Sequence, residues 1–150
     1  MKQKRQTQVW IHHVALQTAH FEKAFEFYTK LLGLRVVKEP FNFKGKRTLA
    51  WLDAGTITIE LYGVKNDRIP QPYDDRRVGA DHIAFEVQNL DTVLSHLRKH
   101  NVKVLKEPFI PPNDDPQQPH VAFIEGVDGE EIELRKIPCQ CLEEDLEVKL

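Results

Sequence analysis

The 150-residue sequence lacks any long apolar run, contains only two cysteines and has almost no excess of charge of one sign. No stretch approaches the roughly 18 consecutive apolar residues that a membrane-spanning helix needs. The N-terminal residues 1–6 are basic but are not followed by the apolar core of a secretory signal. We therefore expect a cytoplasmic protein without a membrane partner.

The charges are nearly balanced: the sequence contains 21 Lys and Arg and 23 Asp and Glu residues, which gives a formal net charge of −2. Such a protein has no general field that attracts nucleic acid, so we expect a small-molecule partner and no nucleic acid. Cys139 and Cys141 are too close in sequence for a favourable mutual disulfide and too few for a zinc site. We interpret them as reduced thiols in an exposed tail.

The main feature that the sequence does contain is one pattern that occurs twice. His13 begins the segment His-Val-Ala-Leu, and His82 begins the similar segment His-Ile-Ala-Phe. Each half later contains an Ile-Glu-Leu triplet, centred on Glu60 and Glu133. The histidines are 69 positions apart (82 − 13) and the glutamates 73 (133 − 60), so one loop insertion in the second copy accounts for the difference.

Hydrophobic periodicity predicts the order β-α-β-β-β in each copy. Apolar residues at helical spacing predict a helix over 21–32, with Thr18 as its N-cap and Gly33 at its end. A second helix is predicted from about 90 to 101, capped by Asn89 or Asp91. Alternating or apolar runs predict the strands, which are 9–17, 34–37 (broken near Pro40), 47–52, 56–62, 81–87, 102–105, 121–124 and 131–137. Five prolines from Pro108 to Pro119 predict a long proline-rich loop after the strand at 102–105.

The expected fold class is α+β, in which the two βαβββ repeats form a curved sheet trough. In each repeat the apolar strand face is available to the helix, so the His and Glu face lies away from it. The predicted boundaries are a single domain at 8–137, repeats at 8–63 and 80–137, a linker at 64–79 and a C-terminal tail at 138–150.

Four polar residues are expected on the inner wall of this trough: His13, Glu60, His82 and Glu133. Two imidazoles and two carboxylates suit a zinc, nickel, cobalt, iron or manganese ion. Each residue alone is more simply explained as an exposed polar side chain on a half-buried strand, but equivalent positions in two copies favour a shared site. His12 competes with His13, although the strand pattern predicts that it faces the helix.

Four segments combine in this chain: residues 13–16, the helix end at 25–34, the Asp-His-Ile-Ala-Phe strand at 81–85 and the Asp-Gly-Glu-Glu-Ile-Glu-Leu ending at 128–134. Together they resemble the vicinal oxygen chelate superfamily, over about residues 9–137. Within it, the order His, Glu, His, Glu most resembles the glyoxalase I (lactoylglutathione lyase) family. Methylmalonyl-CoA epimerases usually have Gln in place of Glu60, whereas extradiol dioxygenases and fosfomycin-resistance transferases use two His and one Glu.

The resemblance implies a metal-dependent lyase or isomerase that converts a thiol hemithioacetal, such as the methylglyoxal–glutathione adduct, into a thioester through an enediolate. It implies one divalent ion per site, nickel, cobalt or zinc, bound by His13, Glu60, His82 and Glu133. Glu133 would be the main catalytic base, and Glu60 a ligand that could act as a second base. A homodimer is also implied.

One position departs from the family pattern. The arginine that holds the glutathione carboxylate in bacterial glyoxalase I corresponds to Gln17, which cannot make the same charged bidentate contact. Arg47, Arg76 or Arg77 could replace it, so the substrate-binding residues stay open. Two alternative functions also stay open: an epimerase or dioxygenase acting on another substrate, and a non-catalytic ligand-binding protein of the bleomycin-resistance type.

Overall fold

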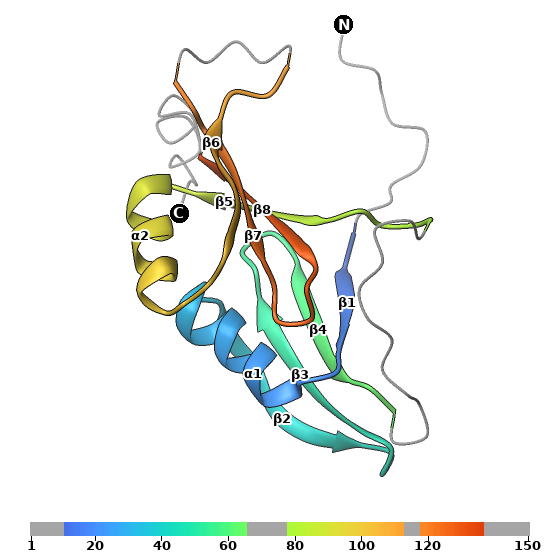
Figure 1. The fold of residues 1–150 in the computed structure, drawn as a ribbon. Coiled ribbons are helices and arrows are strands. Elements are labelled where there is room, and N and C mark those ends of the chain that lie inside the picture. The colour runs from blue at the N-terminus through green and yellow to red at the C-terminus, as the bar shows by residue number, and fades with distance from the viewer. Residues whose placement is uncertain (1–10, 66–77, 113–117, 137–150) are drawn as a thin grey trace, which may run out of the picture. The chain divides into compact units, whose positions relative to one another are not determined.

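The computed structural model describes residues 11–65, 78–112 and 118–136, and the chain divides into two compact units, 1–71 and 72–150. Both units have the predicted order β-α-β-β-β (Figure 1). The first contains β1 (His13–Thr18), α1 (Phe21–Glu26), the π-helical η1 (Phe27–Leu31), β2 (Arg35–Phe43), β3 (Arg47–Asp53) and β4 (Thr58–Gly63). The second contains β5 (Ile83–Val87), α2 (Leu90–Lys99), β6 (Val104–Phe109), β7 (Val121–Glu125) and β8 (Glu131–Lys136).

Each unit forms one four-stranded mixed sheet with the same topology. The strand order is β1-β4-β3-β2 in the first unit and β5-β8-β7-β6 in the second. The first strand of each unit pairs in parallel with the last, and the other neighbours are antiparallel. The predicted α+β class and the duplicated βαβββ unit are therefore confirmed.

The core of each unit lies between its helix and one face of its sheet. In the first unit α1 packs on β4, whose Ile59 and Leu61 are at most 1% exposed. In the second, α2 packs on β6 and β8, and Ile132 and Leu134 of β8 are fully buried. Burying each such side chain contributes about 1.5–3 kcal/mol. Because side chains alternate along a strand, Glu60, which lies between Ile59 and Leu61, is directed to the opposite face, and Glu133 likewise.

The first helix differs from the prediction. Thr18 ends β1 instead of capping the helix, and its Oγ1 accepts a hydrogen bond from the backbone N–H of His20 (3.0 Å). A threonine hydroxyl readily closes such a short turn, which competes with capping. From Phe27 the helix widens into η1, where the N–H of Leu32 donates to the carbonyl of Phe27 (3.0 Å). Gly33 ends the segment at φ +77°, as predicted.

Two prolines do not end strands where the sequence predicts. Pro40 lies inside β2 and Pro108 inside β6, at positions where the pairing register shifts. Both strands lie at a sheet edge, where a residue without an N–H is tolerated at a bulge. The predicted breaks are therefore wrong.

Parts of the predicted organisation lie outside the described residues: most of the 64–79 linker, the middle of the proline-rich loop, and the tail with Cys139 and Cys141. Arg76 and Arg77 also lie outside them. None of the described helices is long and apolar enough to cross a membrane.

Candidate metal centre

The first unit brings together His13 and Glu60 on adjacent parallel strands. Ala15, two residues after His13 on β1, is the register partner of Glu60 on β4. His13 Nε2 is 3.4 Å from Glu60 Oε2, and the two side chains are 37% and 14% exposed. The strand pairing therefore presents one imidazole and one carboxylate on the face opposite α1.

The second unit repeats this arrangement with His82 and Glu133. His82 immediately precedes β5, and Ala84 is the register partner of Glu133 on β8. His82 Nε2 is 2.9 Å from Glu133 Oε2, and the side chains are 30% and 11% exposed. Both predicted His–Glu pairs thus exist, one in each unit.

The spacing of each pair fits two neighbouring ligands of one cation. Two donors that each lie about 2.0–2.2 Å from a metal, at an angle between about 90° and 109°, are about 2.8–3.6 Å apart. The observed separations of 3.4 and 2.9 Å lie in this range. Within the described parts of the chain no three His, Cys, Asp or Glu side chains are gathered around one point. Each unit therefore supplies two neighbouring donors.

His82 is held by two carboxylates. Its Nδ1 lies 2.7 Å from Asp81 Oδ2, while Nε2 faces Glu133. The hydrogen bond to Asp81 is the main reason that the pKa of His82 is raised; Glu133 adds to the rise and burial opposes it. A second ring nitrogen bonded to a carboxylate is the usual arrangement for a metal-binding imidazole, because it fixes the tautomer.

In the first unit, the imidazole of His12 contacts His13 in the way that Asp81 contacts His82. His12 Nδ1 lies 2.8 Å from His13 Nδ1, and the rings meet edge to face. His12 is exposed and also lies near Trp51, so the prediction that it faces the helix is wrong. The reason is that β1 begins at His13, and the alternation of a strand does not extend to His12.

Each pair also has an aromatic neighbour that the sequence did not reveal. Trp51 is the register partner of Glu60, and its ring is 5.1 Å from that of His13. Phe123 is the register partner of Glu133, and its ring is 5.4 Å from that of His82. These neighbours follow from the antiparallel strand register of β3 with β4 and of β7 with β8, and hydrophobic periodicity alone does not predict that register.

The two glutamates differ in their other contacts. Arg135, two residues after Glu133, donates from Nε to Glu133 Oε1 at 3.0 Å. Tyr62, two residues after Glu60, interacts with Glu60 and lies under the guanidinium of Arg47. Burial is the main cause that raises the pKa of Tyr62, Glu60 raises it further, and Arg47 lowers it. Glu133 thus has a cationic donor where Glu60 has a phenol.

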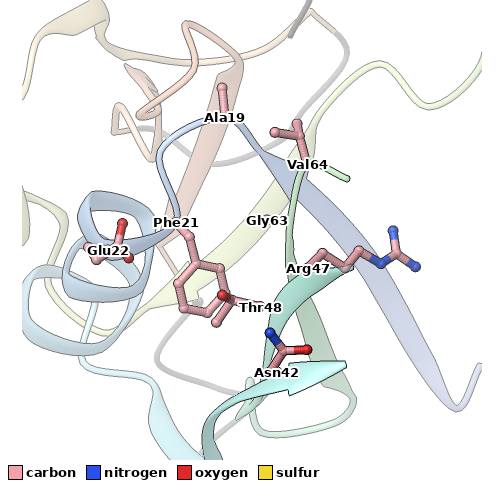
Figure 2. A pocket seen from close by; sticks show the side chains of 8 residues that line it. All are labelled: Ala19, Phe21, Glu22, Asn42, Arg47, Thr48, Gly63 and Val64. Carbon is pink, nitrogen blue, oxygen red and sulfur yellow. The ribbon is translucent and has the colours of Figure 1, made fainter. Parts of the chain in front are cut away.

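Two surface hollows of the first unit differ in their distance from the His13–Glu60 pair. Figure 2 shows one that is lined by Phe21 of α1, Thr48 and Gly63, and none of the four candidate ligands lines it. The other includes Trp51 and Thr58, the register partner of His13. The second hollow therefore adjoins the His13–Glu60 pair.

Comparison with known proteins identifies relatives of the same fold. The sequence profile of the Glyoxalase/Bleomycin resistance protein/Dioxygenase superfamily matches residues 10–134. The lactoylglutathione lyase of Escherichia coli O157:H7 is 28% identical over 129 residues, covering 81% of this chain and 88% of that protein. The uncharacterized protein YaeR of Escherichia coli (strain K12) is 29% identical over 98 residues, covering 62% and 72%.

Solved structures share the architecture. The trypanothione-dependent glyoxalase I of Leishmania major superposes with a TM-score of 0.64 at 22% identity, covering 86% of this chain and 87% of that one. At 22% identity this similarity shows a shared fold and no more.

Proposed function

The chain belongs to the glyoxalase/bleomycin resistance protein/dioxygenase superfamily, and from this premise we propose that it is a metal-dependent lyase or isomerase of the glyoxalase I type. The proposed substrate is a thiol hemithioacetal such as the methylglyoxal–glutathione adduct, and the product is the thioester. The observation that carries the proposal is the presence of one His–Glu pair at equivalent positions of each unit. The distant lactoylglutathione lyase relatives support the choice of reaction.

His13, Glu60, His82 and Glu133 would together hold one divalent ion, nickel, cobalt or zinc. Their separations within each unit and their nitrogen and oxygen donors are suited to such an ion. When bound, the ion would polarise the substrate carbonyl and stabilise the negative charge of the enediolate.

Glu133 is the proposed main base. Its side chain is 11% exposed, and Arg135 fixes one carboxylate oxygen while the other faces His82. The carboxylate removes the proton from the hemithioacetal carbon; the electrons of that C–H bond form the C=C bond of the enediolate, and the π electrons of the adjacent carbonyl move onto its oxygen. The same carboxyl group returns the proton to the neighbouring carbon, and the hemithioacetal hydroxyl proton passes to the former carbonyl oxygen as the thioester C=O forms. The reaction is an isomerisation, so it needs no oxidant or reductant.

Glu60 is proposed as a ligand that could act as a second base. Its contacts include His13 and the phenol of Tyr62. Without a cationic donor such as Arg135, it is the less firmly oriented carboxylate, which agrees with the secondary role.

We also propose a homodimer, which the family resemblance implies, and a cytoplasmic location. Light scattering after size-exclusion chromatography measures the mass of the assembly. A mass of twice 17.5 kDa is expected.

The test of the function is turnover of the methylglyoxal–glutathione adduct by full-length protein supplied with nickel, cobalt or zinc. Glu133→Gln should lower kcat about 10²- to 10⁴-fold, the usual contribution of a positioned base. Glu131→Gln is the matched control, because Glu131 lies two residues earlier on the same face of β8. Absence of metal-dependent turnover would overturn the proposal; ligand binding without product or oxygen uptake with a catechol would redirect it to the alternatives.

A further inference from the structure

Arg47 places a positive charge on the same sheet face as the His13–Glu60 pair. It is the first residue of β3, and its guanidinium carbon lies 3.7 Å from the centre of the Tyr62 ring. Tyr62 follows Glu60 by two residues on β4, so the two side chains share a face. In Figure 2 the Arg47 side chain extends away from Phe21 and Glu22 of α1.

Arg47 differs from the other arginines whose positions are described. Each of the others pairs with a carboxylate: Arg35 with Asp53, Arg98 with Glu107 and Arg135 with Glu133. Within the described residues no carboxylate pairs with Arg47, which rests on an aromatic ring. Stacking uses the face of the guanidinium. Arg47 also has a side-chain hydrogen bond with Tyr62, but a guanidinium carries five N–H donors, so donors remain available to an anion.

The described residue at the equivalent position of the second unit is not a cation. Leu49 is the register partner of Tyr62 in the first unit, and Val121 is the register partner of Arg135 in the second, so the two pairs occupy equivalent positions. Two residues earlier in each hairpin stand Arg47 and Pro119. The charge therefore belongs to one half of the duplicated frame, as expected if it recognises one end of an asymmetric substrate.

The position of Arg47 fits a substrate anion that lies several bonds away from the substrate oxygens that the metal ion would bind. Two residues of a strand span about 6.5–7 Å, which separates Tyr62 from Glu60 along β4. Gln17, the register partner of Tyr62 on β1, adds an amide on the same face. Because the protein as a whole has a net charge of −2, attraction of an anion must be local.

We propose that Arg47, supported by Tyr62, binds a carboxylate on the thiol-derived arm of the substrate, and so selects hemithioacetals of anionic thiols over those of neutral thiols. This inference rests on the proposed function for the identity of the chelated end. It assigns the binding of the substrate carboxylate to Arg47 on β3, because the uncharged Gln17 cannot make that charged contact.

The binding test uses calorimetric titration of the full-length chain with S-methylglutathione and with its dimethyl ester. Wild type should bind the acid more tightly than the ester. Arg47→Gln should weaken binding of the acid about 10- to 100-fold, the usual effect of losing a charged hydrogen bond, with little effect on the ester. Arg47→Lys should restore part of the affinity. Arg35→Gln is the matched control, because Arg35 is already paired with Asp53.

The kinetic test compares methylglyoxal adducts of glutathione and of 2-mercaptoethanol with nickel-loaded protein. Arg47→Gln should raise KM for the glutathione adduct alone. Equal binding of acid and ester by wild type, unchanged acid binding in Arg47→Gln, or an equal loss in Arg35→Gln would overturn the inference. Selective loss of acid binding in Arg47→Gln without turnover of either adduct would uphold the anion site and reject the proposed function.

Discussion

At the scale of single residues, the two halves of the candidate centre share their ligand types but differ in what holds each carboxylate. Glu133 accepts a hydrogen bond from Arg135, whereas Glu60 neighbours a phenol. This difference is the structural basis for assigning proton transfer mainly to Glu133. A base must be oriented toward the reacting carbon, and a charged donor on one oxygen restricts its rotation.

Replacing Arg135 tests this orientation. Arg135→Gln should lower kcat about tenfold or more, because the carboxylate loses a charge-assisted hydrogen bond, while nickel affinity changes much less. Steady-state kinetics and calorimetric titration with nickel measure the two effects. Equal losses in kcat and in metal affinity would show that Arg135 supports the ligand set as a whole, and an unchanged kcat would remove its role in catalysis.

The raised pKa of His82 gives a pH dependence for the metal-free protein. A folded-state pKa above the ordinary value of 6.5 means that the protonated imidazole stabilises the fold below that value. This contribution is lost as the pH rises through the folded-state pKa. His82→Gln should therefore lower Tm more, relative to wild type, at about pH 5.5 than at about pH 8.5.

Thermal unfolding followed by circular dichroism in the presence of a chelator measures this difference. His20→Gln, which alters a histidine outside the candidate centre, is the control. A larger difference between wild type and His82→Gln at the higher pH would contradict the assignment of the shift to the Asp81 and Glu133 carboxylates.

At the scale of elements, the sequence predicted what depends on local pattern. The α2 helix begins after Asn89, one of the two predicted caps, whose Oδ1 accepts from the N–H of Thr92 (2.9 Å). Pro40 and Pro108 were misread as strand ends because their effect depends on the position of a strand in the sheet. Whether a strand lies at an edge is set by tertiary pairing, which a single segment does not contain.

Loss of the α2 cap has a defined expected cost. Asn89→Ala should lower the free energy of unfolding by about 1 kcal/mol, because the N–H of Thr92 loses its partner. Asn89→Ser should retain most of the stability, since serine can cap in the same way. Urea unfolding of the metal-free protein measures both. Equal stability of wild type and Asn89→Ala would contradict the capping role.

At the scale of the whole molecule, repetition made the four candidate ligands predictable. Matching His and Glu positions in two copies singled out one pair in each unit, and the structure contains both pairs. Trp51 and Phe123 were not predicted as neighbours of the pairs, because their places depend on strand register. The sequence left Arg47, Arg76 and Arg77 open as candidates for binding the substrate carboxylate, and only the fold shows which of the described arginines lacks a carboxylate partner.

The central claim is that one ion is bound by ligands from both units, so each chain contributes one complete set of four. The most direct measurement is metal content by elemental analysis of nickel-supplemented wild type, His13→Ala, His82→Ala and, as a control outside the candidate centre, His20→Ala. We predict one ion per chain in wild type and His20→Ala. Both other variants should lose affinity by more than the about 10- to 100-fold that removal of an outer-shell partner costs. Full metal content in either His13→Ala or His82→Ala, or two ions per wild-type chain, would contradict the claim.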